Sequence, residues 1–456
     1  MSGGTLPEGW VGSSLGDVLD VNSGVGFPIK FQGKNSGDYP VYKVSDISLA
    51  VTKNNGNLST AGHYISKEEA VELKGKIFRP SSTAFAKIGE AVKLNRRAIV
   101  HSPGLADNNV MVISAVLHEM DKFIFHFMNT IDLSEQARST TVPSIRKGDI
   151  ENIRLALPSI YEQKIIAEKL DTLLAQVDST KARLEQIPQI LKRFRQAVLA
   201  AVVDGKSANT NTDERTLTTL GNIAKDIKYG TSKKCSETQG STAVLRIPNI
   251  GPGYIINSNL KYADFDQKEL ATLTLKEGDL LLIRSNGSVD LVGKVAVISE
   301  NDIEYLYAGY LIRVRPNKER SVPKYISYCL QSPQLRQIIE NIARSTSGVN
   351  NINSKELASL EIPLPPLSEQ HEIVRRVEQL FAWADTIEKQ VNSALTRVNN
   401  LTQSILAKAF RGELTAQWRA ENPDLISGEN SAAALLEKIK AERAASGGKK
   451  NSRKKA

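Results

Sequence analysis

The sequence predicts an α+β protein in which two pseudo-repeated mixed α/β domains are joined by two long antiparallel coiled-coil helices. Three observations support this fold class. The chain has 456 residues, which is more than one hydrophobic core usually organises. A segment that begins at Leu157 recurs in similar form 207 residues later, and both copies carry apolar residues at heptad spacing. The regions before the two copies also resemble each other, because both contain short β-rich runs separated by turn residues.

The repeat is clearest between residues 157–205 and residues 364–412. Twelve of the 49 aligned pairs are identical, and the alignment needs no gap. Each copy begins with a proline that an acidic residue soon follows, and each ends on a glycine, Gly205 or Gly412. These are typical start and stop signals of a helix. Pro188 lies inside the first copy and should kink or break that helix.

The apolar residues of both copies follow the alternating steps of four and three that define a heptad seam. A single stripe of this kind usually faces a globular core, but two matched stripes of equal length favour a helix pair. An old duplication without present meaning is the alternative explanation of the similarity. The predicted seam residues are Ile166, Leu170, Leu173, Val177, Leu184, Leu191, Val198, Ile373, Val377, Leu380, Ile387, Val391, Val398 and Ile405.

The repeat divides the chain into six segments. They are a globular domain at 1–156, a central spacer helix at 157–203, a polar linker at 204–216, a second globular domain at 217–362, a distal spacer helix at 363–410, and a C-terminal segment with a disordered basic tail at 411–456. Short β-rich runs occupy 40–47, 76–80, 109–116, 242–250, 279–285, 294–299 and 310–316, and helical stretches follow at 121–139 and 323–345. We expect mostly antiparallel strands.

Charge and composition exclude little. The net charge is +9, but the last fourteen residues hold six Lys and Arg and no acidic residue, so the rest carries only about +3. No apolar run reaches the roughly 18 residues of a membrane span, and the N-terminus lacks the pattern of a signal peptide. We expect a cytoplasmic protein whose two cysteines, Cys235 and Cys329, are reduced, with a bridge between them as the alternative.

Six polar loops recur at matching places in the two predicted domains. Their Arg, Lys, Ser, Thr and Asn side chains can reach phosphates and base edges, although such clusters are also ordinary turns. The loops span 23–30, 81–90, 138–148, 229–234, 284–290 and 344–355. The candidate DNA-binding residues are Lys30, Lys87, Arg138, Ser139, Thr140, Thr141, Lys233, Lys234, Arg284, Asn286, Ser288, Arg344, Asn350 and Asn351.

Motifs for catalysis or cofactor binding are missing from the sequence. There is no Gly-rich phosphate loop, no nucleotide fingerprint after a strand, no Asn-Pro-Pro-Tyr motif and no Gly-x-Ser-x-Gly elbow. The five histidines are scattered and do not have the spacing of zinc ligands. We therefore expect no catalytic residues and no metal on this chain. We expect a binding protein that works with other, catalytic proteins.

Several stretches resemble the specificity subunits of type I restriction–modification enzymes, and most of all the type IA group of enteric bacteria. These stretches are residues 163–199, 369–391, 401–430 and 433–450. The duplicated plan covers the whole chain, whereas the two globular domains match this family in layout only. Variation there is expected where target sequences differ.

The resemblance implies a non-catalytic subunit that gives a larger complex its DNA sequence specificity. Each globular domain would be a target recognition domain that reads one half of a bipartite, asymmetric site in double-stranded DNA. The helix pair would set the gap between the half-sites and hold two modification (methyltransferase) subunits and two restriction (translocase and nuclease) subunits. This chain would bind no cofactor, while S-adenosylmethionine, ATP and Mg²⁺ would bind to the partner subunits.

Two other readings are possible from the residues alone. A non-catalytic coiled-coil adaptor, joining two binding modules not specific for DNA, would explain the helices and the missing chemistry but not the paired polar loops. A cryptic enzyme in one globular half would need a paired acid or a nucleophile with its base, which the sequence does not reveal.

Overall fold

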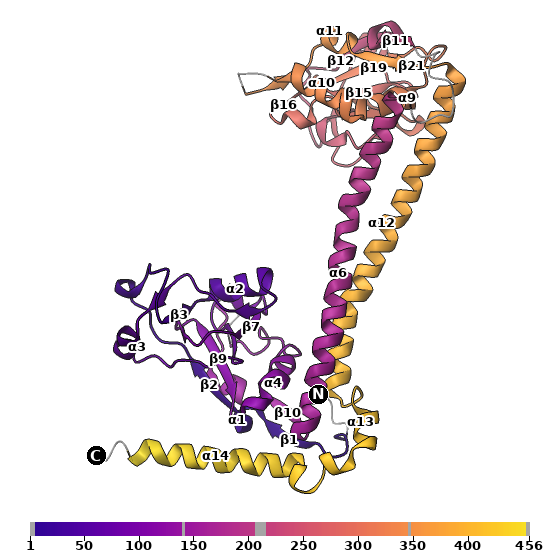
Figure 1. Ribbon diagram of the computed structural model, residues 1–456. Coiled ribbons are helices and arrows are strands. Elements are labelled where there is room, and N and C mark those ends of the chain that lie inside the picture. The colour runs from indigo at the N-terminus through magenta and orange to yellow at the C-terminus, as the bar shows by residue number, and fades with distance from the viewer. Residues whose placement is uncertain (1–4, 139–141, 206–215, 345–347, 453–456) are drawn as a thin grey trace. The chain divides into compact units, whose positions relative to one another are not determined.

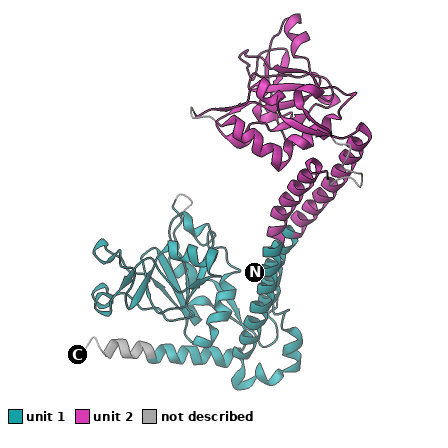
Figure 2. Ribbon diagram, turned by 45° about the horizontal axis from the view of Figure 1, so that its top comes forward, with its two compact units in different colours: residues 1–183, 395–456 teal, residues 184–394 magenta. Residues whose placement is uncertain are grey.

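The computed structural model describes residues 5–138, 142–205, 216–344 and 348–452 (Figure 1). Two helices of 44 residues each, α6 (Ile160–Val203) and α12 (Leu367–Phe410), are its longest elements. The chain forms two compact units, which are residues 1–183 with 395–456 and residues 184–394 (Figure 2). Each unit holds one mixed domain and a part of each long helix. The α+β class with two repeated domains and two long helices is therefore confirmed.

The domain of the first unit contains a five-stranded sheet in the order β2-β9-β6-β7-β4. Its strands are antiparallel except for β4 and β7, which run parallel. A three-stranded sheet, β5-β3-β8, and an antiparallel pair, β1 with β10, complete the domain. The strands are β1 (Val11–Ser14), β2 (Leu19–Ser23), β3 (Tyr39–Tyr42), β4 (Asn57–Leu58), β5 (Tyr64–Ile65), β6 (Thr83–Ala86), β7 (Arg97–Val100), β8 (Leu105–Ala106), β9 (Val110–Ala115) and β10 (Arg154–Leu157).

The domain of the second unit repeats this plan. Its main sheet has the order β12-β19-β15-β17, its three-stranded sheet is β14-β13-β18, and β11 pairs with β21. The strands are β11 (Thr216–Thr219), β12 (Ala224–Tyr229), β13 (Thr242–Leu245), β14 (Lys261–Ala263), β15 (Leu280–Ile283), β16 (Ser285–Asn286), β17 (Val295–Val297), β18 (Leu306–Tyr307), β19 (Leu311–Pro316), β20 (Asn350–Asn351) and β21 (Glu361–Leu364).

The sheets of the two domains differ by additions at their edges. The order β2-β9-β6-β7 corresponds to β12-β19-β15-β17, strand for strand. In both three-stranded sheets the central strand runs antiparallel to one neighbour and parallel to the other. The first domain adds β4, and the second adds the short pair β16·β20. The faint sequence similarity upstream of the long helices therefore reflects one duplicated fold.

The other α-helices are all shorter than α6 and α12. They are α1 (Leu15–Val18), α2 (Val44–Lys53), α3 (Lys67–Leu73), α4 (Asp121–Met128), α5 (Lys147–Glu151), α7 (Leu220–Ile223), α8 (Gln267–Leu273), α9 (Pro323–Gln331), α10 (Pro333–Ala343), α11 (Ser354–Ala358), α13 (Ala416–Glu421) and α14 (Ala432–Ser452). The helical stretches expected after each sheet correspond to α4 in the first domain and to α9 with α10 in the second.

In the first unit one hydrophobic core joins the main sheet to α4 and to both long helices. Phe123 and Phe127 of α4 each lie 5.3 Å, between ring centroids, from Phe410 at the end of α12. Ile166 and Leu170 of α6 are fully buried in the same core. Aromatic pairs at this separation add to the stability that burial provides. The mixed domain of the first unit is thus packed directly on the long helices.

In the second unit the end of α6 lies antiparallel beside the beginning of α12 (Figure 2). Arg195 donates hydrogen bonds of 2.6 Å to Asp385 and 2.9 Å to Glu388. The Phe194 and Trp383 rings meet edge to face, with centroids 5.6 Å apart. Gly205 and Gly412, which we expected to end the two helices, have φ angles of +78° and +75°. These left-handed values are typical of helix C-terminal glycines.

Most predicted seam residues are removed from solvent. Those that are buried are Ile166, Leu170, Val177, Leu191, Ile373, Val377 and Val391. Those that are half-buried are Leu173, Leu184, Val198, Ile387, Val398 and Ile405.

Leu380 departs from the expected seam, because its side chain is 40% exposed. Here α12 packs on the second domain as well as on α6. The ring of the neighbouring Phe381 lies 6.0 Å from that of Tyr328 in α9, and Lys324 of the same helix pairs with Glu378. The face of α12 that is covered therefore turns toward the domain and leaves Leu380 outside.

Two of the expected strands also differ from the structure. The run 40–47 is a strand only to Tyr42, because the Asp46 side chain accepts a 2.8 Å hydrogen bond from the Lys43 amide and starts α2. The run 76–80 forms a single bridge, between Phe78 and Gly104, rather than a strand.

Pro188 does not break its helix, since α6 is continuous from Ile160 to Val203. Pro188 is exposed, so the carbonyl that loses its hydrogen-bond donor can be hydrated. The C-terminal segment, expected to end in a disordered tail, is helical as far as Ser452 in α14.

Candidate nucleic-acid interface

In the first unit a basic residue follows the central strand of the main sheet. Strand β6 ends at Ala86, and the next residue is Lys87. The Lys87 amide donates a 2.9 Å hydrogen bond to the carbonyl of Asn109, and the Ile145 amide donates a 2.8 Å bond to the Lys87 carbonyl. The Lys87 ammonium donates to Ser23 Oγ at 3.0 Å. Hydrogen bonds through its backbone amide and carbonyl thus fix Lys87 beside the segments that carry Asn109 and Ile145, and its side chain contacts the segment that carries Ser23.

The second unit has the same arrangement after β15. Arg284 follows Ile283, its amide donates a 2.9 Å hydrogen bond to the Tyr310 carbonyl, and its carbonyl accepts a 2.9 Å bond from the Ile352 amide. Lys87 and Arg284 are therefore structurally equivalent. The offset between them is not the 207 residues of the helices, because the connecting loops of the two domains differ in length.

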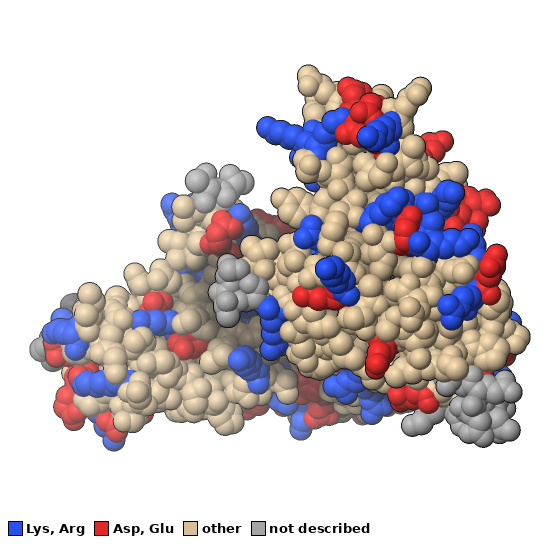
Figure 3. Space-filling model, turned by 90° about the horizontal axis from the view of Figure 1, so that it is seen from above, with Lys and Arg blue, Asp and Glu red and all other residues tan. Residues whose placement is uncertain are grey.

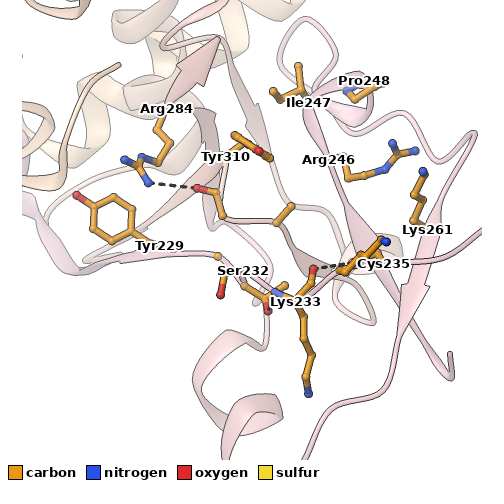
Figure 4. A pocket seen from close by; sticks show the side chains of 15 residues that line it. Tyr229, Ser232, Lys233, Cys235, Arg246, Ile247, Pro248, Lys261, Arg284 and Tyr310 are labelled. Atoms are coloured by element: carbon orange, nitrogen blue, oxygen red, sulfur yellow. Dashed lines mark hydrogen bonds between the residues drawn. The ribbon is translucent and has the colours of Figure 1, made fainter. Parts of the chain in front are cut away.

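The Arg284 side chain is held by groups that carry no charge. Its Nη2 atom donates a 3.0 Å hydrogen bond to Oδ1 of Asn351, and its Nη1 atom donates a 3.3 Å bond to the carbonyl of Gly309. The guanidinium carbon lies 4.5 Å from the centroid of the Tyr229 ring (Figure 4). Stacking of this kind is a favourable cation–π contact that also fixes the plane of the guanidinium.

The Tyr229 hydroxyl is held in turn. It accepts a 2.8 Å hydrogen bond from the Ser354 amide and donates a 3.1 Å bond to Ser354 Oγ. Burial tends to raise the pKa of Tyr229, but the bonds to Ser354 and the positive charge of Arg284 outweigh it and lower that pKa. Tyr229, at the end of β12, and Arg284, just after β15, therefore form a preorganised pair.

Tyr229 and Arg284 lie on the wall of an open cleft of about 790 Å³ in the second unit (Figure 4). The lining residues include five cations and no carboxylate, although Lys233 and Lys261 pair with Glu269 and Glu237 outside the lining. The three cations without a carboxylate partner in the described residues still favour an anionic ligand. The cationic residues are Lys233, Lys234, Arg246, Lys261 and Arg284. Figure 4 shows Arg246 and Lys261 together on one side of the cleft, with Arg284 and Tyr229 on the opposite side.

Close approach of the backbone builds the floor of this cleft, and the matching strand end of the first unit has the same close approach. A Cβ atom on Gly230 would lie 2.3 Å from the carbonyl oxygens of both Tyr307 and Ala308. A Cβ atom on Gly24, at the matching place in the first unit, would lie 2.0 Å from the carbonyl oxygen of Asp107. Only glycine fits at either position. Each allows the chain that leaves β2 or β12 to cross directly onto the three-stranded sheet.

The predicted residues of the second domain come together in part. β16 and β20 pair antiparallel, with Asn286 opposite Asn350. The side-chain amide of Asn350 donates a 2.9 Å hydrogen bond through Nδ2 to the carbonyl of Gly287. The backbone amide of Ser288 donates a 2.9 Å bond to Asn286 Oδ1. These polar side chains surround the loop that follows Arg284. Lys234 and Arg344 are both exposed, and of the two only Lys234 lines the cleft.

Three predicted cations are already paired with carboxylates. Lys30 lies 2.5 Å from Glu72, and Lys233 lies 2.7 Å from Glu269. Arg138 forms a forked pair with the carboxylate of Asp149, at distances of 2.5 to 3.1 Å.

A phosphate would have to compete for these cations, so they are poorer candidates than the sequence suggests. Figure 3 likewise shows Lys and Arg beside Asp and Glu over much of the face that it presents. Ser139, Thr140 and Thr141 lie outside the described residues.

Sequence reasoning missed the aromatic and part of the basic lining of the cleft. Tyr229 opens the predicted polar loop 229–234 but was not among the candidate residues, and Tyr310 lies in the run 310–316 that was expected to be a strand. Arg246 and Lys261 lie in strands and turns far from the six polar loops. An alignment of Gly24 with Gly230 would have pointed to Tyr229. The residue before each glycine contacts the basic side chain of its domain, since Ser23 contacts Lys87 and Tyr229 contacts Arg284.

The side chains that could hold a metal ion are not gathered together in the described part of the chain. No group of three or more His, Cys, Asp or Glu side chains there is placed to hold a metal ion. Cys235 and Cys329 are both free thiols. Of the helices that the structure describes, none has both the length and the apolar character needed to cross a membrane.

A duplicated domain that places a basic residue at the same point of its loop cluster in both copies, Lys87 and Arg284, and that is carried on a pair of long helices, defines a two-site binding protein with a helical spacer. The family model of the type I restriction modification DNA specificity domain matches residues 7–189 and again residues 210–397. The chain belongs to this family and is a type I restriction–modification specificity subunit.

Relatives and solved structures agree with this assignment. The chain is 44% identical to the type I restriction enzyme EcoKI specificity subunit of Escherichia coli K12 and 43% identical to the StySPI specificity subunit of Salmonella potsdam, over the full length of each protein. The fold matches the HsdS subunit from Thermoanaerobacter tengcongensis with a TM-score of 0.61 at 22% identity, over 90% of this chain and 99% of that one.

A second solved chain, from a study of complex assembly in the type I R-M system, gives a TM-score of 0.67 at 21% identity. It covers 90% of this chain and 100% of that one. At these identities the two structures establish the fold alone. The reading of the chain as an adaptor for modules not specific for DNA is set aside, since the matching family is defined by DNA specificity.

Proposed function

We propose that each mixed domain is a target recognition domain that reads one half of a bipartite, asymmetric sequence in double-stranded DNA. The observation that carries this proposal is that equivalent loop clusters hold different side chains. In the first unit the cluster centres on Lys87 and Ser23, and in the second it centres on Arg284 and Tyr229. One duplicated frame with two different sets of contacts suits a site whose halves differ.

The long helices would act as the spacer and as the docking surface for partner subunits. α6 and α12 each begin in one compact unit and end in the other, so they connect the two recognition domains twice. Because the plan is duplicated, it offers two similar surfaces. This supports a complex with two modification subunits and two restriction subunits, which acts on DNA in the cytoplasm.

Cofactor chemistry would belong to those partners. S-adenosylmethionine would bind to the modification subunits, and ATP and Mg²⁺ would bind to the restriction subunits. This chain would contribute contacts to DNA and no cofactor site. Its charge agrees with that division, because removing the six cations of the last fourteen residues from the net +9 leaves only about +3. Recognition would then depend on specific contacts more than on bulk attraction.

The experiment is to map methylated bases in the genome of a host that expresses this chain with its modification subunits. A motif of two defined half-sites separated by an undefined gap of constant length is expected. The same host expressing the modification subunits alone is the control. A single contiguous motif, or methylation without sequence preference, would contradict the proposal.

A domain exchange makes the test sharper. Residues 217–362 would be replaced by the corresponding domain of a relative, and the first domain would be left intact. Only one half of the methylated motif should change. If both halves change, or neither does, the two domains do not read independent half-sites.

A further inference from the structure

We propose that Arg284 reads a guanine in the half-site of the second domain, and that Lys87 is the equivalent reading residue of the first domain. This inference rests on the proposed function and adds to it a residue and a base. It assigns one position of the duplicated frame, the first residue after the central strand, as a base-reading position in both halves.

The chemistry of the two side chains selects the base. Arginine and lysine carry hydrogen-bond donors and no acceptor. In the major groove only guanine presents two adjacent acceptors, O6 and N7, with no donor on the same base. Adenine places an amino donor beside N7, which would face a like donor. Two donor-only side chains at equivalent positions therefore predict a guanine in each half-site.

The charge of both side chains remains available to a ligand. In the described part of the chain, the partners of Arg284 are the Asn351 amide oxygen, the Gly309 carbonyl and the Tyr229 ring. The partner of Lys87 is the hydroxyl of Ser23. None of these groups is an anion. By contrast, three of the other five candidate cations, Lys30, Arg138 and Lys233, have carboxylate partners.

The orientation of Arg284 distinguishes base reading from a phosphate contact. A phosphate is satisfied by a flexible cation, and an exposed residue such as Lys234 can supply one. Arg284 is half-buried, stacked on Tyr229, and bonded through both terminal nitrogens. Two of its five N–H groups are used in this way, which leaves one N–H on each terminal nitrogen for the two acceptors of a guanine. A side chain that is already ordered loses little entropy on binding.

The test uses the complete complex of this chain with its modification subunits, and its readout is the methylated motif. In Arg284→Gln one guanine of a single half-site should become degenerate or shift toward adenine, since glutamine pairs with adenine. Discrimination at that position should fall roughly ten- to hundred-fold. Lys87→Gln should do the same in the other half-site only. Arg284→Lys should keep the preference for guanine in weakened form.

Lys318→Gln is the matched control. Strand β19 pairs Leu311 with Ile283, next to Arg284, and runs away to Pro316, so Lys318 lies beyond the opposite end of the sheet. It is exposed and should leave the motif unchanged.

Two results would overturn the inference. One is an intact motif with uniformly weaker methylation and a shallower salt dependence, which is the signature of a phosphate contact. The other is loss of methylation on every sequence in both Arg284→Gln and Arg284→Lys at an unchanged melting temperature. If the unaltered complex fails to produce a bipartite motif, the proposed function fails instead, whatever the variants do.

Discussion

The ammonium of Lys122 in α4 lies 3.0 Å from the carboxylate of Asp171 in α6, and this ion pair ties the first recognition domain to its helix. The second unit repeats the contact, with Lys324 of α9 paired to Glu378 of α12. The repeated pairing fixes each domain against the helix that follows it. The two contacts differ in one neighbouring residue. In the first unit His126 also forms a 2.8 Å hydrogen bond to Asp171 through Nε2.

We expect the first unit to lose stability as the pH falls below about 6.5. Burial lowers the pKa of His126 in the folded chain from its usual 6.5, while the hydrogen bond to Asp171 opposes the shift. The unfolded chain therefore takes up the proton first as the pH falls, and unfolding becomes more favourable. One proton gives a slope of up to about 1.4 kcal/mol per pH unit. Urea denaturation at several pH values between 7.5 and 5 measures it.

The control for this pH dependence is His126→Gln, which removes the titrating group. The slope between pH 7 and pH 5 should become smaller in that variant. An equal slope in both chains would mean that other groups dominate in this range. The position equivalent to His126 in α9 is Tyr328, so the second unit should lack this contribution.

Substitution of Glu162 should destabilise the first unit strongly. Its carboxylate is fully buried at the start of α6. It accepts hydrogen bonds from Trp10 Nε1 at 2.9 Å, from Thr415 Oγ1 at 2.5 Å and from Arg419 at 2.6 Å. In Glu162→Gln the Arg419 charge would lose its counter-ion in a largely buried place. The free energy of unfolding in urea should fall by roughly 3 kcal/mol.

Glu413→Gln is the control for Glu162→Gln. Glu413 pairs with Arg411, but both side chains are exposed, and such pairs contribute little. Its substitution should leave the urea midpoint nearly unchanged. Equal effects of the two substitutions would show that the buried network is not what anchors the chain ends to α6.

Gly24→Ala should destabilise the first domain, and Gly230→Ala the second. A methyl group at either position would meet backbone carbonyl oxygens within 2.3 Å, and these cannot move without separating the two sheets. We expect a loss of at least about 2 kcal/mol in each case. Thermal melting would measure it. Gly26→Ala is the comparison, since no heavy atom lies within 4 Å of its added carbon; a similar loss there would refute the steric explanation.

Lengthening the helix pair should change the gap between half-sites. Seven residues would be inserted after Arg183 in α6 and seven after Ala394 in α12, which preserves the heptad spacing. The added length is roughly 10 Å, or up to about three base pairs. The methylated motif of the assembled complex reports the gap. A full-activity complex with an unchanged gap would argue against the helices as the spacer.

The features that depend on periodicity could be predicted from the sequence. The two long helices follow from the heptad spacing, and Gly205 and Gly412 mark their ends. Leu380 could not be predicted, because its exposure depends on a domain contact made through Phe381. Pro188 does not interrupt its helix, although the sequence allowed a break there. The rule for proline is local and does not include the support that a paired helix receives along its length.

The loop cluster was predicted less well because it is built from long-range contacts. Arg284 was identified, but Tyr229, which orders it, lies 55 residues earlier in the chain. The pairing of Arg138 with Asp149 was also invisible, since it requires the turn into α5 to be in place. Residue type alone does not reveal which cations are already neutralised.

The first unit is built from two stretches that are far apart in the sequence, residues 1–183 and 395–456, and this affects how the chain folds during synthesis. Its core includes Leu406, Phe410, Leu435 and Ile439, which leave the ribosome hundreds of residues after Trp10. The second unit is one uninterrupted stretch, residues 184–394, and can close as soon as that stretch has emerged. The domain that is translated first is therefore completed last, and until then its apolar surface needs protection from other chains.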